Sequence, residues 1–157
     1  MDAVLIIHVI ISLLGIVSGY IVIGGMLQAQ RLPRWTAFFL VTTVLTSATG
    51  FLFPFVKLLP SHILAVLSLI ILPISIYALY GKKLVGRWRA TYVITAIVAQ
   101  YLNVFVLIFQ AFQKLPPLHA LAPTQSEPPF AVAQGVNLLA FIALGYLATK
   151  KFHPTAS

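Results

Sequence analysis

The chain has 157 residues, of which 61% are hydrophobic and 8% are charged, whereas soluble domains carry about 25% charged residues. This composition excludes an ordinary soluble fold, and the absence of cysteine excludes disulfides and thiolate chemistry, so we expect residues 1–157 to form one all-α transmembrane domain. The net charge of +8 does not indicate nucleic acid as a partner, because the cations lie between apolar segments, where membrane topology explains them.

Five apolar segments follow one another along the chain, and none of them contains Asp, Glu, Lys or Arg. They cover residues 3–27, 35–53, 62–80, 91–112 and 130–149, and each has at least 19 residues. A helix needs ~20 apolar residues to cross a bilayer, and a barrel would need alternating hydrophobicity, which is absent. We therefore predict a polytopic bundle of five transmembrane helices.

The first segment has a face of small and polar residues. His8, Ser12, Gly15, Gly19 and Val22 recur at intervals of three and four residues, which places them on one side of a helix. In membranes, small faces pack against other helices, and broad apolar faces meet lipid. We expect this face to point into the bundle, and its small residues also leave a homo-oligomer open.

The connecting segments carry characteristic turn residues. Pro33 is placed to begin the second helix, Ser61 to cap the third, and Pro73 predicts a kink within the third. We interpret residues 81–89 as a basic connector. Residues 114–129 hold five prolines, and we expect that much proline to prevent a regular helix in this long loop.

The basic residues divide unequally between the two sides of the predicted bundle. One side carries Lys57 and Lys114, and the other carries eight cations. These eight are Arg31, Arg34, Lys82, Lys83, Arg87, Arg89, Lys150 and Lys151. The positive-inside rule then places the N-terminus and the Pro-rich 114–129 loop outside and the C-terminus in the cytoplasm. The expected location is the cell membrane, as a multi-pass protein, which in a bacterium is the inner membrane.

Most polar residues of the segments fall in the outer half of this bundle and predict a polar pocket that opens outward. The candidate pocket residues are Asn103, Gln110, Gln113, His119, Glu127, Gln134 and Asn137. Amide side chains of this kind can hold a solute or a quinone. They can equally link helices by hydrogen bonds, which is their more frequent role.

His8 and His62 are the candidate cofactor ligands, because imidazoles on two helices of a bundle can bind the iron of a b-type haem. By helical rise His62 lies ~6 Å shallower than His8, so a shared iron requires that the first helix tilts or that the third helix begins earlier. The structural alternative is that His62 caps its helix and His8 hydrogen-bonds Ser or Thr. A zinc site with His119 and Glu127 is a further alternative that no His-x-x-x-His spacing supports, and we expect no metal site.

The sequence lacks the motifs of several enzyme classes. It has no glycine-rich phosphate loop, no nucleophile elbow and no pair of intramembrane carboxylates, so we expect a non-enzymatic protein. Three classes remain open. The first is a bundle that binds haem b, quinone or another small apolar ligand, the second is a solute carrier or channel, and the third is an accessory subunit that joins other membrane subunits.

Overall fold

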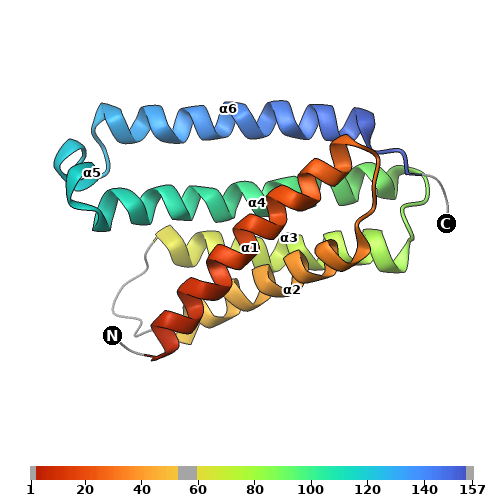
Figure 1. Cartoon of the computed structure of the whole chain (residues 1–157), viewed down its shortest axis with the longest axis horizontal. Coiled ribbons are helices and arrows are strands. Elements are labelled where there is room, and N and C mark those ends of the chain that lie inside the picture. Colours follow the sequence, from red (N-terminus) through yellow and green to blue (C-terminus); the bar gives the residue numbers. More distant parts are fainter. Residues whose placement is uncertain (1–2, 53–59, 155–157) are drawn as a thin grey trace.

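The computed structural model describes residues 3–52 and 60–154, and within these ranges all regular structure is helical. Five helices are long and apolar enough to cross a membrane, which confirms the predicted helical bundle with five candidate spans. They are α1 (Ala3–Leu27), α2 (Pro33–Thr49), α3 (Pro60–Ile76), α4 (Arg87–Lys114) and α6 (Pro128–Lys151). Figure 1 shows them running back and forth between two ends of the molecule, with the short α5 (Pro116–Leu121) between α4 and α6.

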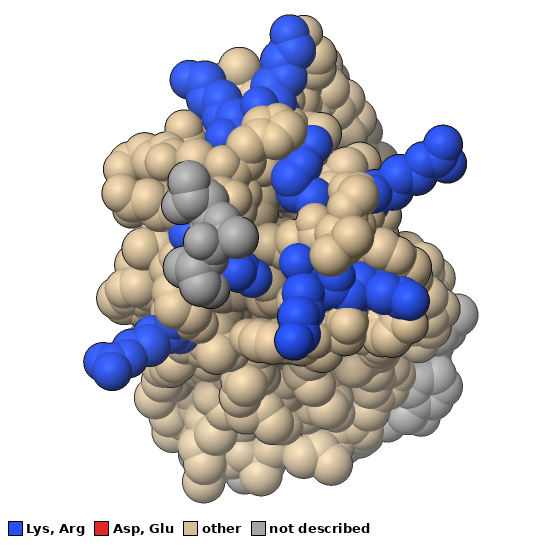
Figure 2. All heavy atoms as spheres, turned by 90° about the vertical axis from the view of Figure 1, so that its right-hand side faces the viewer, with Lys and Arg blue, Asp and Glu red and all other residues tan. Residues whose placement is uncertain are grey.

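The two ends differ in charge. We call the end where α1 begins the N-terminal end, and the opposite end, which holds the eight predicted cations, the basic end. Figure 2 looks onto the basic end and shows Lys and Arg spread over it, with no Asp or Glu among the atoms described on this face. The predicted segregation of cations is therefore present in the folded chain.

Helix ends differ from the predicted ranges by a few residues, except in α1. Helix α2 begins at Pro33, as predicted, because a first-turn residue has no helical hydrogen bond to lose, and it continues as a 3-10 turn over Gly50–Leu52. Helix α3 contains Pro73 and continues as a π-helical turn over Tyr77–Gly81. The predicted end of the second segment at Phe53, the cation Lys57 and the side chain of Ser61 lie outside the described residues.

The Pro-rich loop is not free of helix, which corrects the prediction. Pro116 and Pro117 begin α5 at its first two positions. Proline prevents a helix when it stands in the interior, but at the first turn its fixed φ suits the helix and its missing N–H is not needed.

The connector 81–89 is also shorter than predicted, because Arg87 and Arg89 lie in the first turn of α4. Cations are unfavourable near the positive end of a helix dipole. Arg89 is compensated by α6, since its Nη1 donates to the carbonyl oxygens of Thr149 at 2.8 Å and Phe152 at 2.9 Å, where α6 ends.

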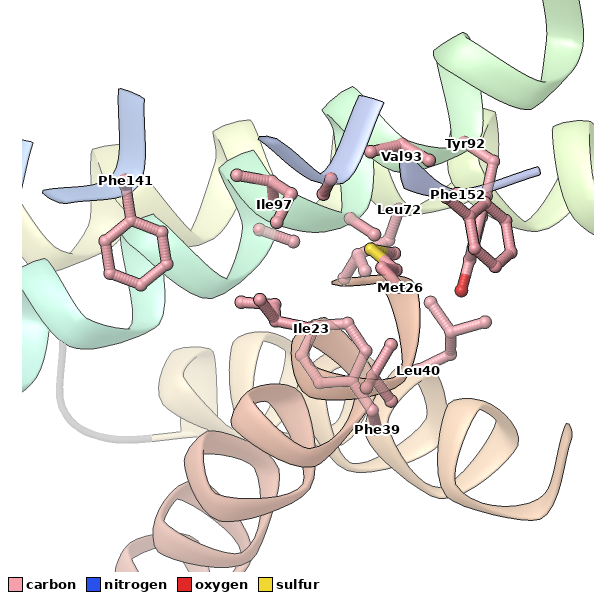
Figure 3. Packing of buried hydrophobic residues seen from close by; sticks show 14 of the residues in the cluster. Ile23, Met26, Phe39, Leu40, Leu72, Tyr92, Val93, Ile97, Phe141 and Phe152 are labelled. Atoms are coloured by element: carbon pink, nitrogen blue, oxygen red, sulfur yellow. The ribbon is translucent and has the colours of Figure 1, made fainter. Parts of the chain in front are cut away.

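Helix α4 is the centre of the bundle. It contacts α1, α3 and α6, and a larger fraction of its residues is buried than in any other candidate span. Figure 3 shows the hydrophobic core, in which Ile23 and Met26 of α1 meet Phe39 of α2 and Ile97 of α4. These residues come from the end of α1 and the first halves of α2 and α4, so the tightly packed core lies in the half toward the basic end.

The small face of α1 points into the bundle, as predicted. Gly15, Gly19 and Val22 are buried. A Cβ on Gly15 would lie 3.2 Å from Oγ1 of Thr42, so α1 and α2 pack closely at this point. At Gly19 the space is occupied by a side chain of α4, Gln100.

Candidate functional site

A cavity of about 630 Å³ lies in the half of the bundle toward the N-terminal end, between α1, α2, α3 and α4. Most of its walls are apolar, with Leu5, Val9 and Leu13 from α1 and Val106 and Leu107 from α4. The polar residues on its walls are His8, Ser12, Thr46, Ser47, His62, Ser68, Asn103, Gln110 and Lys114. Ligand sites in proteins have this character, an apolar lining with a few polar groups.

His8 is held on the cavity wall by α2. Its Nδ1 lies 2.8 Å from Oγ1 of Thr49, and that hydroxyl lies 2.7 Å from the carbonyl oxygen of Leu45. The hydroxyl has a single proton, and its short contact with the Leu45 carbonyl favours donation there, which favours the tautomer of neutral His8 in which Nδ1–H donates to Thr49. In that tautomer the lone pair is on Nε2, and the hydrogen bond of Nδ1 to Thr49 sets the orientation of the ring.

The structural alternative for His8, a hydrogen bond to Ser or Thr within the bundle, is thus present in the structure. It does not compete with ligation. Histidine ligands commonly donate their other ring nitrogen to an oxygen acceptor, which orients the ring toward the bound group.

His62 reaches the same cavity from α3. It lies in the first turn of that helix and is 7% exposed. Its ring is tilted by 35° against the ring of Phe51, with 5.9 Å between the ring centroids. The structure therefore places both candidate imidazoles, from α1 and α3, on the walls of one cavity.

Helix α4 contributes a stripe of polar residues. Asn103 donates from Nδ2 to Oγ1 of Thr43 at 3.3 Å, so it also links α4 to α2. Gln110 lies two turns further on, and its Oε1 is buried without a hydrogen-bond partner. Lys114 ends α4 instead of lying in the predicted loop, and it also lines the cavity. Its spacing of four from Gln110 places it on the same helix face, and this signal was available in the sequence.

Five candidate pocket residues do not line the cavity. Gln113 and His119 are exposed. Gln134 and Asn137 are buried on α6, and Nε2 of Gln134 donates to the carbonyl oxygen of Phe105 at 3.1 Å, so this amide links α6 to α4. The cavity is formed by α1 to α4, whereas α6 packs chiefly on α4, which explains why residues of similar depth do not meet.

Glu127 stabilises the turn that precedes α6. Its carboxylate accepts from the backbone N–H of Thr124 at 3.1 Å, from the hydroxyl of Thr124 at 2.6 Å and from the N–H of Ser126 at 3.1 Å. The Thr124 hydroxyl is the main reason that the pKa of this exposed carboxyl is below its ordinary value.

The zinc alternative finds no support in the arrangement. Across residues 3–52 and 60–154, no three His, Asp or Glu side chains lie close enough together to hold a metal ion. Neither His119 on α5 nor Glu127 before α6 is among the residues that line the cavity.

Comparison of the chain with protein-family models, with curated proteins and with solved structures gives no match.

Proposed function

We propose that the chain is a multi-pass protein of the cell membrane, the inner membrane in a bacterium, with its N-terminal end outside and its basic end in the cytoplasm. Five apolar helices support insertion. The eight cations at one end support the orientation, because Lys and Arg are retained on the cytoplasmic side. Trp35, Tyr77 and Tyr80 are exposed near the basic end, where aromatic residues anchor a helix at the membrane interface.

The cavity is the proposed functional site, and its proposed guest is a largely apolar cofactor of the b-haem or quinone type. The observation that carries this proposal is that His8 and His62, from two different helices, line one cavity with mainly apolar walls. Two imidazoles can bind a haem iron from opposite sides, and imidazole and amide groups can also hold the oxygens of a quinone. The protein would bind and orient the cofactor, and any redox chemistry would belong to the cofactor.

A buried oxygen on the cavity wall supports the presence of a guest. Oε1 of Gln110 has no hydrogen-bond partner. A buried polar atom without a partner costs roughly 1–3 kcal/mol, which a donor on the guest, or a water molecule that accompanies it, would offset.

The test is the cofactor content of the purified full-length protein. We expect a Soret band, or a quinone released by solvent extraction, in protein prepared in mild detergent. His8→Ala and His62→Ala should each lose or shift that signal while still eluting as folded protein. His153→Ala is the matched control, because His153 is exposed at the basic end. Wild-type protein that holds neither cofactor, even after haemin and quinone are added, would contradict the proposal.

A further inference from the structure

Lys114 is the cavity residue that a neutral apolar guest does not explain. Its side chain lines the cavity, and it is the only Lys or Arg at the N-terminal end among the described residues. No carboxylate of the described residues lies within ion-pair distance of it. Glu127, the one acid in the described part of the chain, is hydrogen-bonded to Thr124 and Ser126. Within the described part of the chain, the cavity thus has a positive charge at one edge that no carboxylate pairs with.

The position of Lys114 along α4 shows which edge this is. Asn103, Gln110 and Lys114 share the face of α4 that lines the cavity, and Lys114 is the last residue of the helix. Eleven residues separate Asn103 from Lys114, which corresponds to about 16 Å along the helix axis. Asn103 therefore lies deep in the bundle, and Lys114 lies at the mouth, where its side chain is exposed.

We propose that the guest of this cavity is an amphipathic carboxylate, with its apolar body between α1 and α4 and its acidic group at the mouth, paired with Lys114. Apolar walls favour the body of such a molecule, and the lysine favours its charged end. This inference rests on the proposed function and narrows it, because a porphyrin such as haem carries carboxylates and a quinone does not. A fatty acid offers the same chemistry, so the experiment must separate the two sources.

The experiment compares two ligands that differ only at their carboxyl groups, which are anionic in one and methyl-esterified, and so uncharged, in the other. Purified full-length protein in detergent is titrated with haemin and with haemin dimethyl ester, and binding is followed by the Soret absorbance. Wild-type protein should bind haemin about tenfold more tightly than the ester, as expected for one charge pair at the edge of an apolar cavity. Lys114→Gln should remove that difference, and Lys114→Arg should keep it. Lys151→Gln, an exposed lysine at the basic end, is the control and should behave as wild type.

Further titrations with laurate and with a short-chain ubiquinone distinguish this inference from the proposed function. Equal binding of haemin and its ester, or a Lys114→Gln variant that keeps the preference, overturns the inference alone. Ubiquinone binding without haemin or laurate binding also overturns it and leaves the proposed function standing. If laurate binds through Lys114 and the protein holds neither haem nor quinone, the result supports an anionic guest and overturns the proposal that the guest is a cofactor. Failure of every ligand to bind overturns both.

Discussion

Gln100 of α4 occupies the space that the missing side chain of Gly19 leaves on α1. Its Nε2 donates to the carbonyl oxygen of Ile16 at 2.7 Å, and Gln100 is fully buried. A Cβ on Gly19 would collide with the amide of Gln100. The two helices are thus joined by a hydrogen bond from a side chain to the backbone, and any side chain at position 19 would have to displace the amide of Gln100 that makes it.

Gly19→Ala is expected to destabilise the bundle by about 1–3 kcal/mol, the usual effect of overpacking a tight contact. Gly24→Ala in the same helix is the control, because a Cβ at Gly24 would meet no atom within 4 Å. Alanine is the better helix former, so this variant should be neutral or slightly more stable. The measurement is the apparent melting temperature in mild detergent. Equal melting temperatures for the two variants would contradict the close contact.

The same pair predicts a coupling between two substitutions. In a Gln100→Ala background the collision is absent, so adding Gly19→Ala should cost less than it does in the wild type. Contacting residues commonly show coupling energies of about 0.5–3 kcal/mol. Strict additivity of the two effects would show that Gln100 is not the group that Gly19 accommodates.

Arg89 predicts a second, independent effect on stability. Its guanidinium donates to the last carbonyl groups of α6, and hydrogen bonds from charged groups contribute about 1.5–3 kcal/mol. Arg89→Ala should lower the melting temperature and increase hydrogen exchange in residues 149–154. Arg87→Ala serves as the control, because it removes an exposed cation two residues earlier in the chain. Unchanged exchange at the end of α6 in Arg89→Ala would rule out this capping role.

The five helices and the inward face of α1 could be predicted because they depend on local hydrophobicity and helical periodicity. The contact of Gln100 with Gly19 could not be predicted from the sequence. Periodicity shows which face of a helix is buried, but not which residue of another helix meets it. The capping of α6 by Arg89 was missed for the same reason, since the two partners are 60 residues apart. Helix α5 was missed for a different reason, because the effect of proline was applied without regard to its position in the helix.

The candidate site was predicted in part because depth along a helix can be counted from the sequence. His8, His62, Asn103 and Gln110 were assigned to one end and do line one cavity. Gln134 was assigned to the same depth, but depth does not give the order of the helices around the bundle. Helix α6 lies against α4, and its amides serve that interface.

The hydrogen bond of His8 predicts its tautomer. Because Thr49 donates to Leu45, neutral His8 should carry its proton on Nδ1. Nitrogen-15 chemical shifts of the imidazole distinguish the two tautomers, and Thr49→Val should remove the preference for Nδ1–H. An Nε2–H tautomer in the wild type would reverse the assignment and would also weaken the case for Nε2 as a cofactor ligand.

The turn before α6 predicts a specific pH dependence. The folded-state pKa of Glu127 lies below its ordinary 4.5, so the carboxylate stabilises the turn fully above pH 4.5 and loses this effect as the pH falls through the lowered pKa. A carbon-13 titration of the Glu127 carboxyl should give a midpoint below 4.5. Thr124→Val removes the strongest donor and should move the midpoint upward. A wild-type midpoint at or above 4.5 would mean that these hydrogen bonds do not persist in solution.

The proposed orientation predicts which loops are accessible from outside an intact cell. The chain contains no cysteine, so single cysteines can be introduced without other changes. Ser126→Cys lies in the exposed turn before α6, and Gln28→Cys lies in the exposed joint between α1 and α2 at the basic end. A membrane-impermeant maleimide should label the first in intact cells and the second only after the membrane is permeabilised. Labelling in the opposite order would place the cavity on the cytoplasmic side, because its mouth and Ser126 lie at the same end of the bundle.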